Sequence, residues 1–110
     1  MCFQFQSTFK PNTQLEYLDL SYNNFERLQP FYFSDLSRLL WLNLSNNALD
    51  EMSGRNFARN SLLRVIHMNH NKISRLDANS FRGMRFMRRL YFSDNQINDV
   101  GRGTFRAVSR

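Results

Sequence analysis

The amino-acid sequence predicts an α/β-type solenoid. We expect a curved ribbon in which each repeated unit adds one short parallel strand to a concave face and an irregular or 3-10 segment to a convex face. The chain matches itself when Leu15 is aligned with Leu39, Leu63 and Met87, and the aligned segments contain one column that is always Asn and another that is always Phe. The repeated unit is therefore 24 residues long. A unit of this size cannot bury its apolar face alone, so about three or more neighbouring units are needed for stability.

The self-alignment divides the chain into a partial unit, residues 1–14, and four complete units. The complete units cover residues 15–38, 39–62, 63–86 and 87–110. Seven positions in each unit are expected to be apolar, and Asn60 is the only exception among them. We expect both ends of the array to be uncapped, which predicts an internal piece of a longer protein, or a truncated product, able to associate end to end.

Each complete unit begins with a predicted strand. Leu18 and Leu20 alternate with polar neighbours such as Asp19, the period of two that indicates a strand with one buried face. The segment LSRLLWL alone is also compatible with an amphipathic helix. The alternation recurs in every unit and favours the strand.

Two columns of identical residues are expected to be structural. A carboxamide donates and accepts hydrogen bonds at once, so stacked Asn side chains can pair backbone groups where the chain turns inward. Phe rings in successive units can stack within the core. The Asn column comprises Asn23, Asn47, Asn71 and Asn95, and the Phe column comprises Phe9, Phe33, Phe57, Phe81 and Phe105.

The pattern LxxLxLxxNxLxxLxxxxFxxLxx, which runs from about residue 9 to residue 110, resembles the leucine-rich repeat family in its 24-residue form. LDLSYNNF, LNLSNNAL and YFSDNQI are similar to phrases in the ectodomains of Toll-like receptors, Slit-like proteins and chaoptin-like insect adhesion proteins. The resemblance implies a non-catalytic scaffold from a receptor or adhesion ectodomain, outside the cell or at its surface, that binds a protein ligand or co-receptor without a cofactor. Secreted members usually carry cysteine-rich caps, whereas Cys2 stands alone here and the opening residues lack the apolar stretch of a signal peptide.

The outward-facing strand positions are not needed for the core and are therefore the candidate binding positions. Aromatic residues and Arg are enriched at the energetic centres of protein interfaces, and these positions hold several of each. Alternatively, Trp41 only packs on its lateral neighbours and shields the sheet. The candidate concave-face residues are Tyr17, Asp19, Trp41, Asn43, His67, Arg88, Arg89 and Tyr91.

The charge is unevenly distributed along the chain. Residues 1–54 hold three basic and six acidic groups, a net of −3, and residues 55–110 hold twelve and three, a net of +9, which together give the total of +6. An alternative function is therefore the binding of a polyanion, either a heparan-type glycan or a nucleic acid, through the basic C-terminal half. No recognised nucleic-acid-binding module is present, so specific nucleic-acid recognition is not predicted. A purely architectural spacer is the remaining alternative.

The sequence offers little for catalysis or metal binding. No nucleophile, base and orienting residue occur together, and there is no glycine-rich phosphate loop, so we expect no enzyme activity. His67 and His70 lack the further ligands of a tetrahedral metal site. No apolar run approaches the roughly 20 residues of a membrane span. The tripeptide Asn43-Leu44-Ser45 is a possible N-glycosylation site on the predicted concave face.

Overall fold

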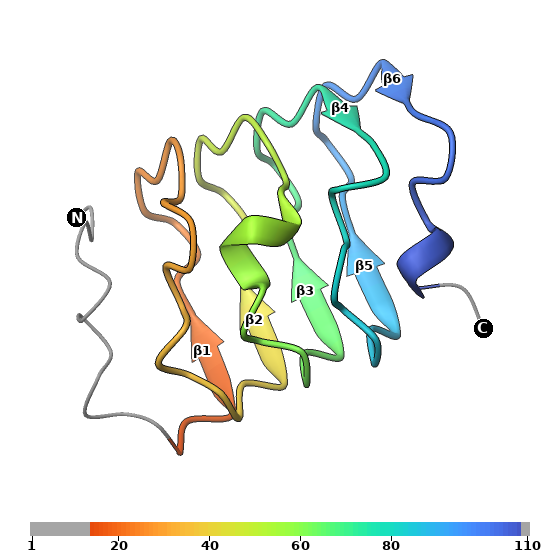
Figure 1. Ribbon diagram of the computed structural model, residues 1–110. Helices are drawn as coiled ribbons and strands as arrows, with labels where there is room; N and C mark the ends of the chain where they lie inside the picture. Colours follow the sequence, from red (N-terminus) through yellow and green to blue (C-terminus); the bar gives the residue numbers. More distant parts are fainter. Residues whose placement is uncertain (1–13, 109–110) are drawn as a thin grey trace.

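The computed structural model describes residues 14–108. Cys2, Phe9 and all but the last residue of the predicted partial unit lie outside this range. The described chain forms an open ribbon in which short strands lie side by side (Figure 1). The main sheet is parallel, in the order β1-β2-β3-β5. Its strands are β1 (Tyr17–Asp19), β2 (Trp41–Asn43), β3 (Val65–His67) and β5 (Arg89–Tyr91).

The strand register reproduces the period of the sequence. Leu18 pairs with Leu42, Leu42 with Ile66, and Ile66 with Leu90. These four side chains lie on the inner face of the sheet, where Leu42 and Ile66 are fully buried. Leu18 and Leu90 are partly buried because each lies in an outermost strand of the sheet.

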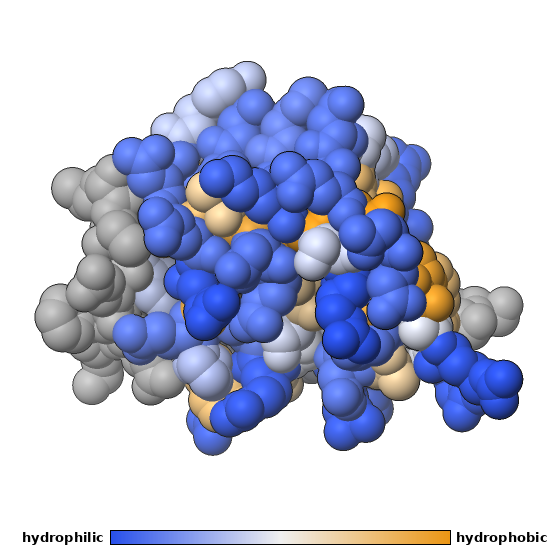
Figure 2. All heavy atoms as spheres, turned by 90° about the horizontal axis from the view of Figure 1, so that it is seen from above, coloured by the Kyte–Doolittle hydropathy of each residue, from blue (hydrophilic) through white to orange (hydrophobic). Residues whose placement is uncertain are grey.

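A second, two-stranded parallel sheet was not predicted. It pairs β4 (Arg75–Leu76) with β6 (Asp99–Val100), again in the register of the repeat. Figure 2 looks onto the edge of the molecule that carries these strands and shows mainly hydrophilic side chains, with hydrophobic surface toward the C-terminal side. Val100, expected to be apolar and buried, is exposed because it lies in the outer strand of this pair.

Two short 3-10 helices lie on the side opposite the main sheet. They are η2 (Gly54–Phe57) and η3 (Arg106–Val108). The Ser53 hydroxyl accepts a hydrogen bond from the Arg55 backbone N–H at 3.2 Å and so caps η2. Gly54 donates its N–H to Asn79 O at 2.8 Å, and a Cβ at Gly54 would lie 2.7 Å from that oxygen. This close approach of neighbouring repeats therefore requires glycine.

The side chains of Asn47, Asn71 and Asn95 each connect a repeat to the one before it. Asn71 donates from Nδ2 to Leu44 O at 3.0 Å and to Met68 O at 3.2 Å, and its Oδ1 accepts from the Leu49 N–H at 3.0 Å. Asn47 and Asn95 make the corresponding bonds in their own repeats. Asn23 donates to Leu20 O at 2.9 Å. The carboxamides therefore pair backbone groups of adjacent turns, which lowers the cost of burying those groups.

The Phe side chains lie beneath the convex segments. Phe33 stacks on Phe57 with ring centroids 5.8 Å apart, and Phe81 stacks on Phe105 at 5.5 Å. Phe33, Phe57 and Phe81 are fully buried. Phe105 differs from the expected core residue because it is 47% exposed. It lies in the last described repeat and is covered by a preceding repeat on one side only.

Asn60, the exception among the apolar positions, is fully buried. Its Nδ2 donates to Phe33 O at 2.8 Å and to Leu36 O at 2.9 Å, both in the preceding repeat. Its Oδ1 is buried and has no hydrogen-bond partner among the described residues. The side chain thus replaces an apolar contact with two hydrogen bonds and leaves one acceptor unsatisfied.

Candidate binding surface

The outward-facing side chains of the main sheet form a continuous line of rings, here called the aromatic stripe: Tyr17, Trp41, His67 and Tyr91. The ring centroids of Tyr17 and Trp41 are 6.1 Å apart, and those of Trp41 and His67 are 5.3 Å apart. His67 and Tyr91 are stacked at 4.4 Å with an angle of 5° between their planes. The stripe crosses all four strands of the sheet.

The stripe changes column between β2 and β3. In the register, Trp41 lies opposite Val65, and His67 lies opposite Asn43. The contact between Trp41 and His67 is therefore diagonal, a distance that aromatic side chains can span across neighbouring strands. The sequence alignment placed these residues in separate columns and did not predict that they would join.

The stripe remains accessible even though its rings pack on one another. Tyr17 is 64% exposed and Tyr91 is 36% exposed, whereas Trp41 and His67 are half-buried. Trp41 thus packs laterally, as one interpretation of the sequence expected, and still presents part of its surface to solvent. Lateral packing therefore restricts the orientation of each ring.

Asp19 and Asn43 are held at the ends of their strands. The Asp19 Oδ1 accepts from the Ser21 N–H, and the Asn43 Oδ1 accepts from the Ser45 N–H, each at 2.9 Å. Hydrogen bonds from the Ser21 side chain and backbone, together with the charge of His67, lower the pKa of Asp19, and partial burial opposes them. Asp19 is therefore an anchored carboxylate beside the stripe.

The opposite end of the surface is basic. Arg88 and Arg89 donate their backbone N–H groups to Arg64 O at 2.8 and 3.1 Å, which brings the three residues together where β3 and β5 begin. Their side chains are exposed and form no ion pair within residues 14–108. Arg64 and Arg88 also line a hollow of about 560 Å³ beside Met87.

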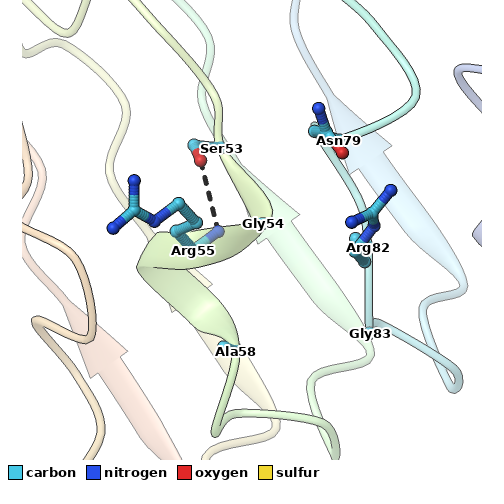
Figure 3. A pocket seen from close by; sticks show the side chains of 7 residues that line it. All are labelled: Ser53, Gly54, Arg55, Ala58, Asn79, Arg82 and Gly83. Atoms are coloured by element: carbon cyan, nitrogen blue, oxygen red, sulfur yellow. Dashed lines mark hydrogen bonds between the residues drawn. The ribbon is translucent and has the colours of Figure 1, made fainter.

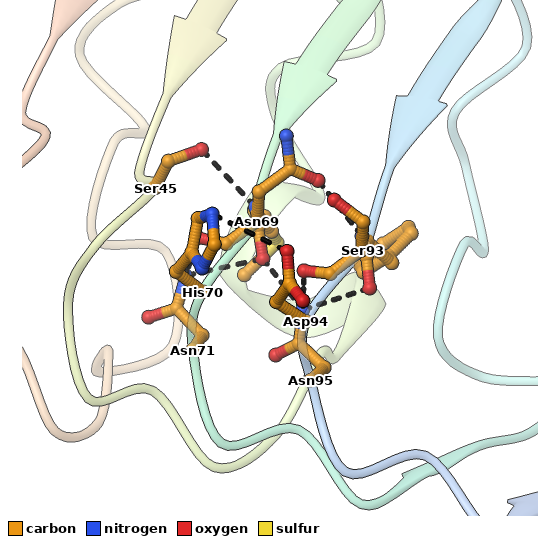
Figure 4. A network of polar contacts seen from close by, with 9 residues as sticks. Ser45, Asn69, His70, Asn71, Ser93, Asp94 and Asn95 are labelled. Carbon is orange, nitrogen blue, oxygen red and sulfur yellow. Dashed lines mark hydrogen bonds and ion pairs between the residues drawn. The ribbon is translucent and has the colours of Figure 1, made fainter.

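A polar network follows the strands at their carboxyl ends (Figure 4). The Ser45 hydroxyl accepts from the Asn69 N–H at 3.1 Å, and the Asn69 Oδ1 accepts from the Ser93 N–H at 2.8 Å. His70 Nε2 lies 3.3 Å from Asp94 Oδ2. Both residues have left-handed backbones, with φ of 57°. The network fixes the edge of the concave face next to the stripe.

The possible glycosylation site lies within this surface. Asn43 is in β2, in register with Asp19 on one side and His67 on the other. Ser45 is buried, and its hydroxyl accepts the hydrogen bond from Asn69. A glycan on Asn43 would therefore stand directly beside Trp41.

Between residues 14 and 108, no three or more His, Cys, Asp or Glu side chains gather where they could hold a metal ion. In the same range, no helix has the length and apolar character needed to cross a membrane.

Comparisons with known proteins agree with the repeat fold. A family model described as "Leucine rich repeat" matches residues 13–73, 41–97 and 61–110. A search of curated proteins gave no significant match. The solenoid of parallel strands predicted from the sequence, and its resemblance to leucine-rich repeats, are confirmed by the family match and by the two structures described next.

Two solved structures share the fold. One is the leucine-rich repeat domain of APL1B, with a TM-score of 0.79 and 22% identity, covering 84% of this chain and 27% of that chain. The other is a TLR13-ssRNA13 complex, with a TM-score of 0.67 and 23% identity, covering 91% of this chain and 18% of that chain. The present chain thus spans less than a third of either protein, and identities this low support the fold alone.

Proposed function

The chain belongs to the leucine-rich repeat family, whose fold commonly serves protein–protein recognition, and we propose that it binds a protein partner through the aromatic stripe on its concave face. Proteins of this family are typically non-enzymatic scaffolds, and we assign the same role to this chain. The partner is a protein ligand or co-receptor.

The observation that carries this proposal is the stripe itself. The inner-face leucines and isoleucine already form the core, so the sheet does not need large rings on its outer face. Tyr and Trp are over-represented among the residues that dominate binding energy. Because each ring already packs on the next, little side-chain freedom remains to be lost on binding.

The two ends of the surface carry opposite charge. Glu16 and Asp19 lie at the β1 end of the stripe, and Arg64, Arg88 and Arg89 lie toward the other end, where β3 and β5 begin. A partner with a basic patch at one end and an acidic patch at the other would dock in one orientation and associate faster at low salt. Asp19, Asn43, Arg88 and Arg89 are therefore proposed as orienting contacts around the stripe.

We further propose that the chain is part of a receptor or adhesion ectodomain at the cell surface. The sequence resemblance to such ectodomains supports this location. If the chain passes through the secretory route, a glycan on Asn43 would restrict access to Trp41 and confine the contact to the ends of the stripe. A mass decrease on enzymatic deglycosylation, absent in Asn43→Gln, would show that the site is occupied.

The test is a binding screen of the full chain against a displayed library of extracellular proteins, followed by substitution. Trp41→Ala and Tyr91→Ala should each weaken any specific partner by about 10-fold or more, since truncated interface hot spots cost about 2 kcal/mol or more. Phe31→Ala is the matched control, because Phe31 is also an exposed aromatic but lies near Arg55 and Arg59 on the other side of the ribbon. A partner that loses affinity only in the control would contradict the proposal, and no dependence on any stripe residue would favour an architectural spacer.

A further inference from the structure

Two adjoining hollows lie on the convex side, away from the aromatic stripe. The first, of about 430 Å³, lies between η2 and the segment from Asn79 to Gly83 (Figure 3). The second, of about 440 Å³, is lined by Ala78, Arg82, Arg102, Gly103 and Arg106. Arg82 borders both hollows, and the surface that they share across successive repeats is here called the convex path.

The second hollow is strongly basic. Arg82, Arg102 and Arg106 are exposed, and none of them forms an ion pair with another described residue. The chain contains no acidic residue from 78 to 93 or after 99. Asp77, just before Ala78, is already engaged by Arg75 at 3.8 Å and by the Asn79 N–H at 2.9 Å. Uncompensated positive charge therefore surrounds this hollow.

Small residues keep the hollow open. Gly103 has a φ of +76°, a conformation that favours glycine, and a Cβ there would lie 3.8 Å from the guanidinium of Arg106. Ala78 is also exposed and lines the same space. The guanidinium of Arg106 can therefore be reached from solvent across Gly103 and Ala78.

We propose that this convex path, centred on Arg82, Arg102 and Arg106, binds a linear sulfated glycan. Guanidinium groups present a planar fork of donors that suits oxyanions and remains charged at physiological pH. Arg82 and Arg106 occupy equivalent positions in successive repeats, so they present two charges one repeat apart along the ribbon. A linear polymer with regularly spaced anionic groups matches that arrangement.

The chemistry of the lining favours a glycan over a nucleic acid. The residues that line the two hollows include no aromatic ring. Single-stranded nucleic acids are held by basic grooves together with rings on which their bases stack. Here only the charge is present, and it suits a polymer recognised through its anionic groups.

The site is independent of the concave surface, because it is built from the returning segments and η3 rather than from the main sheet. The two sites can therefore be tested separately in the same chain. A variant that disrupts one site leaves the residues of the other unchanged.

The experiment measures the affinity of the full chain for a defined heparin oligosaccharide at several salt concentrations. The triple variant Arg82→Gln/Arg102→Gln/Arg106→Gln should bind about 10-fold more weakly or worse. In a plot of the logarithm of the binding constant against the logarithm of the salt concentration, the slope should become shallower by about one unit for each lost contact. The control is Arg64→Gln/Arg88→Gln/Arg89→Gln, which removes the same charge from the concave side and should change affinity less than about 3-fold. Equal losses in both triples, or a larger loss in the control, would overturn the site.

Two further measurements are needed. One distinguishes the role of the shape of the hollow from the role of its charge, and the other distinguishes a sulfated glycan from a nucleic acid. Ala78→Phe keeps every charge but fills the hollow, so it should weaken heparin binding, and unchanged affinity would overturn the role of the hollow. A single-stranded oligonucleotide of matched charge should bind more weakly than the sulfated glycan, and tighter binding of the oligonucleotide would overturn the choice of glycan. Unchanged thermal unfolding of all variants excludes loss of fold as the cause.

Discussion

The inner and outer faces of the same four strands differ in how much their residues vary from one repeat to the next. On the inner face, the residues in register are all aliphatic: Leu18, Leu42, Ile66 and Leu90. On the outer face, the residues in register are two aromatic residues, one aliphatic residue and one basic residue: Tyr17, Trp41, Val65 and Arg89. Both sets occupy strands with the same backbone geometry, so the backbone does not explain the difference.

Burial explains the inner face. Each inner side chain must fit against at least one neighbouring repeat, and a cavity or an unpaired polar group there costs several kcal/mol. The outer face carries no such constraint, so its residues are free to serve recognition. Repetition in this chain therefore indicates structure, and variation indicates the candidate binding surface.

The largest expected effect tests the repeated Phe column. Phe57→Ala should lower the free energy of unfolding by about 3–5 kcal/mol, because the ring is fully buried. Phe105→Ala, in the same column but half exposed, should cost about 1–2 kcal/mol. Urea unfolding of both variants measures the difference. Equal losses would show that burial does not determine how much each Phe of the column contributes to the free energy of unfolding.

The Asn column should give the next largest effect. Asn71→Ala leaves the N–H of Leu49 without its acceptor, and a buried unpaired donor costs about 1–3 kcal/mol. Asn24→Ala is the matched control, because Asn24 is exposed and adjacent in sequence to the column, and it should change stability by less than about 0.5 kcal/mol. Similar losses in the two variants would contradict the structural role of the column.

A substitution at Asn60 tests whether the one polar side chain among the repeated apolar positions is needed for stability. The two carbonyls that Asn60 contacts, those of Phe33 and Leu36, also accept backbone N–H groups. Asn60→Leu therefore removes a buried unsatisfied oxygen without leaving either carbonyl unpaired, and should change the free energy of unfolding by less than about 1.5 kcal/mol. A loss of several kcal/mol would mean that the two side-chain hydrogen bonds are indispensable.

The smallest expected effect concerns the outer face. The pKa of Asp19 is lowered in the folded chain, so the ionised carboxylate favours the folded state above its unfolded value of 3.8, and this contribution is lost as pH falls below that value. Asp19→Asn should therefore destabilise slightly at pH 7, by less than about 1 kcal/mol for so exposed a group. The difference from the original chain should shrink as pH falls below about 4. Chemical unfolding at pH 7 and pH 3 measures it, and a constant difference would contradict the charge-based explanation.

The sequence by itself determined the solenoid, since a constant period with recurrent apolar, Asn and Phe positions allows neighbouring repeats to bury one another in a single register. Outward exposure of Tyr17 and Tyr91 also followed from strand alternation. Only the tertiary structure decided that Trp41 meets His67 across a change of column, that β4 pairs with β6, and that Arg82 joins Arg102 and Arg106 around one hollow. The physical reason is that burial places the same requirement on every repeat, so the same residue types recur at a constant period in the sequence. Contacts between exposed side chains depend instead on the direction in which each side chain points from its own backbone, which the period does not specify.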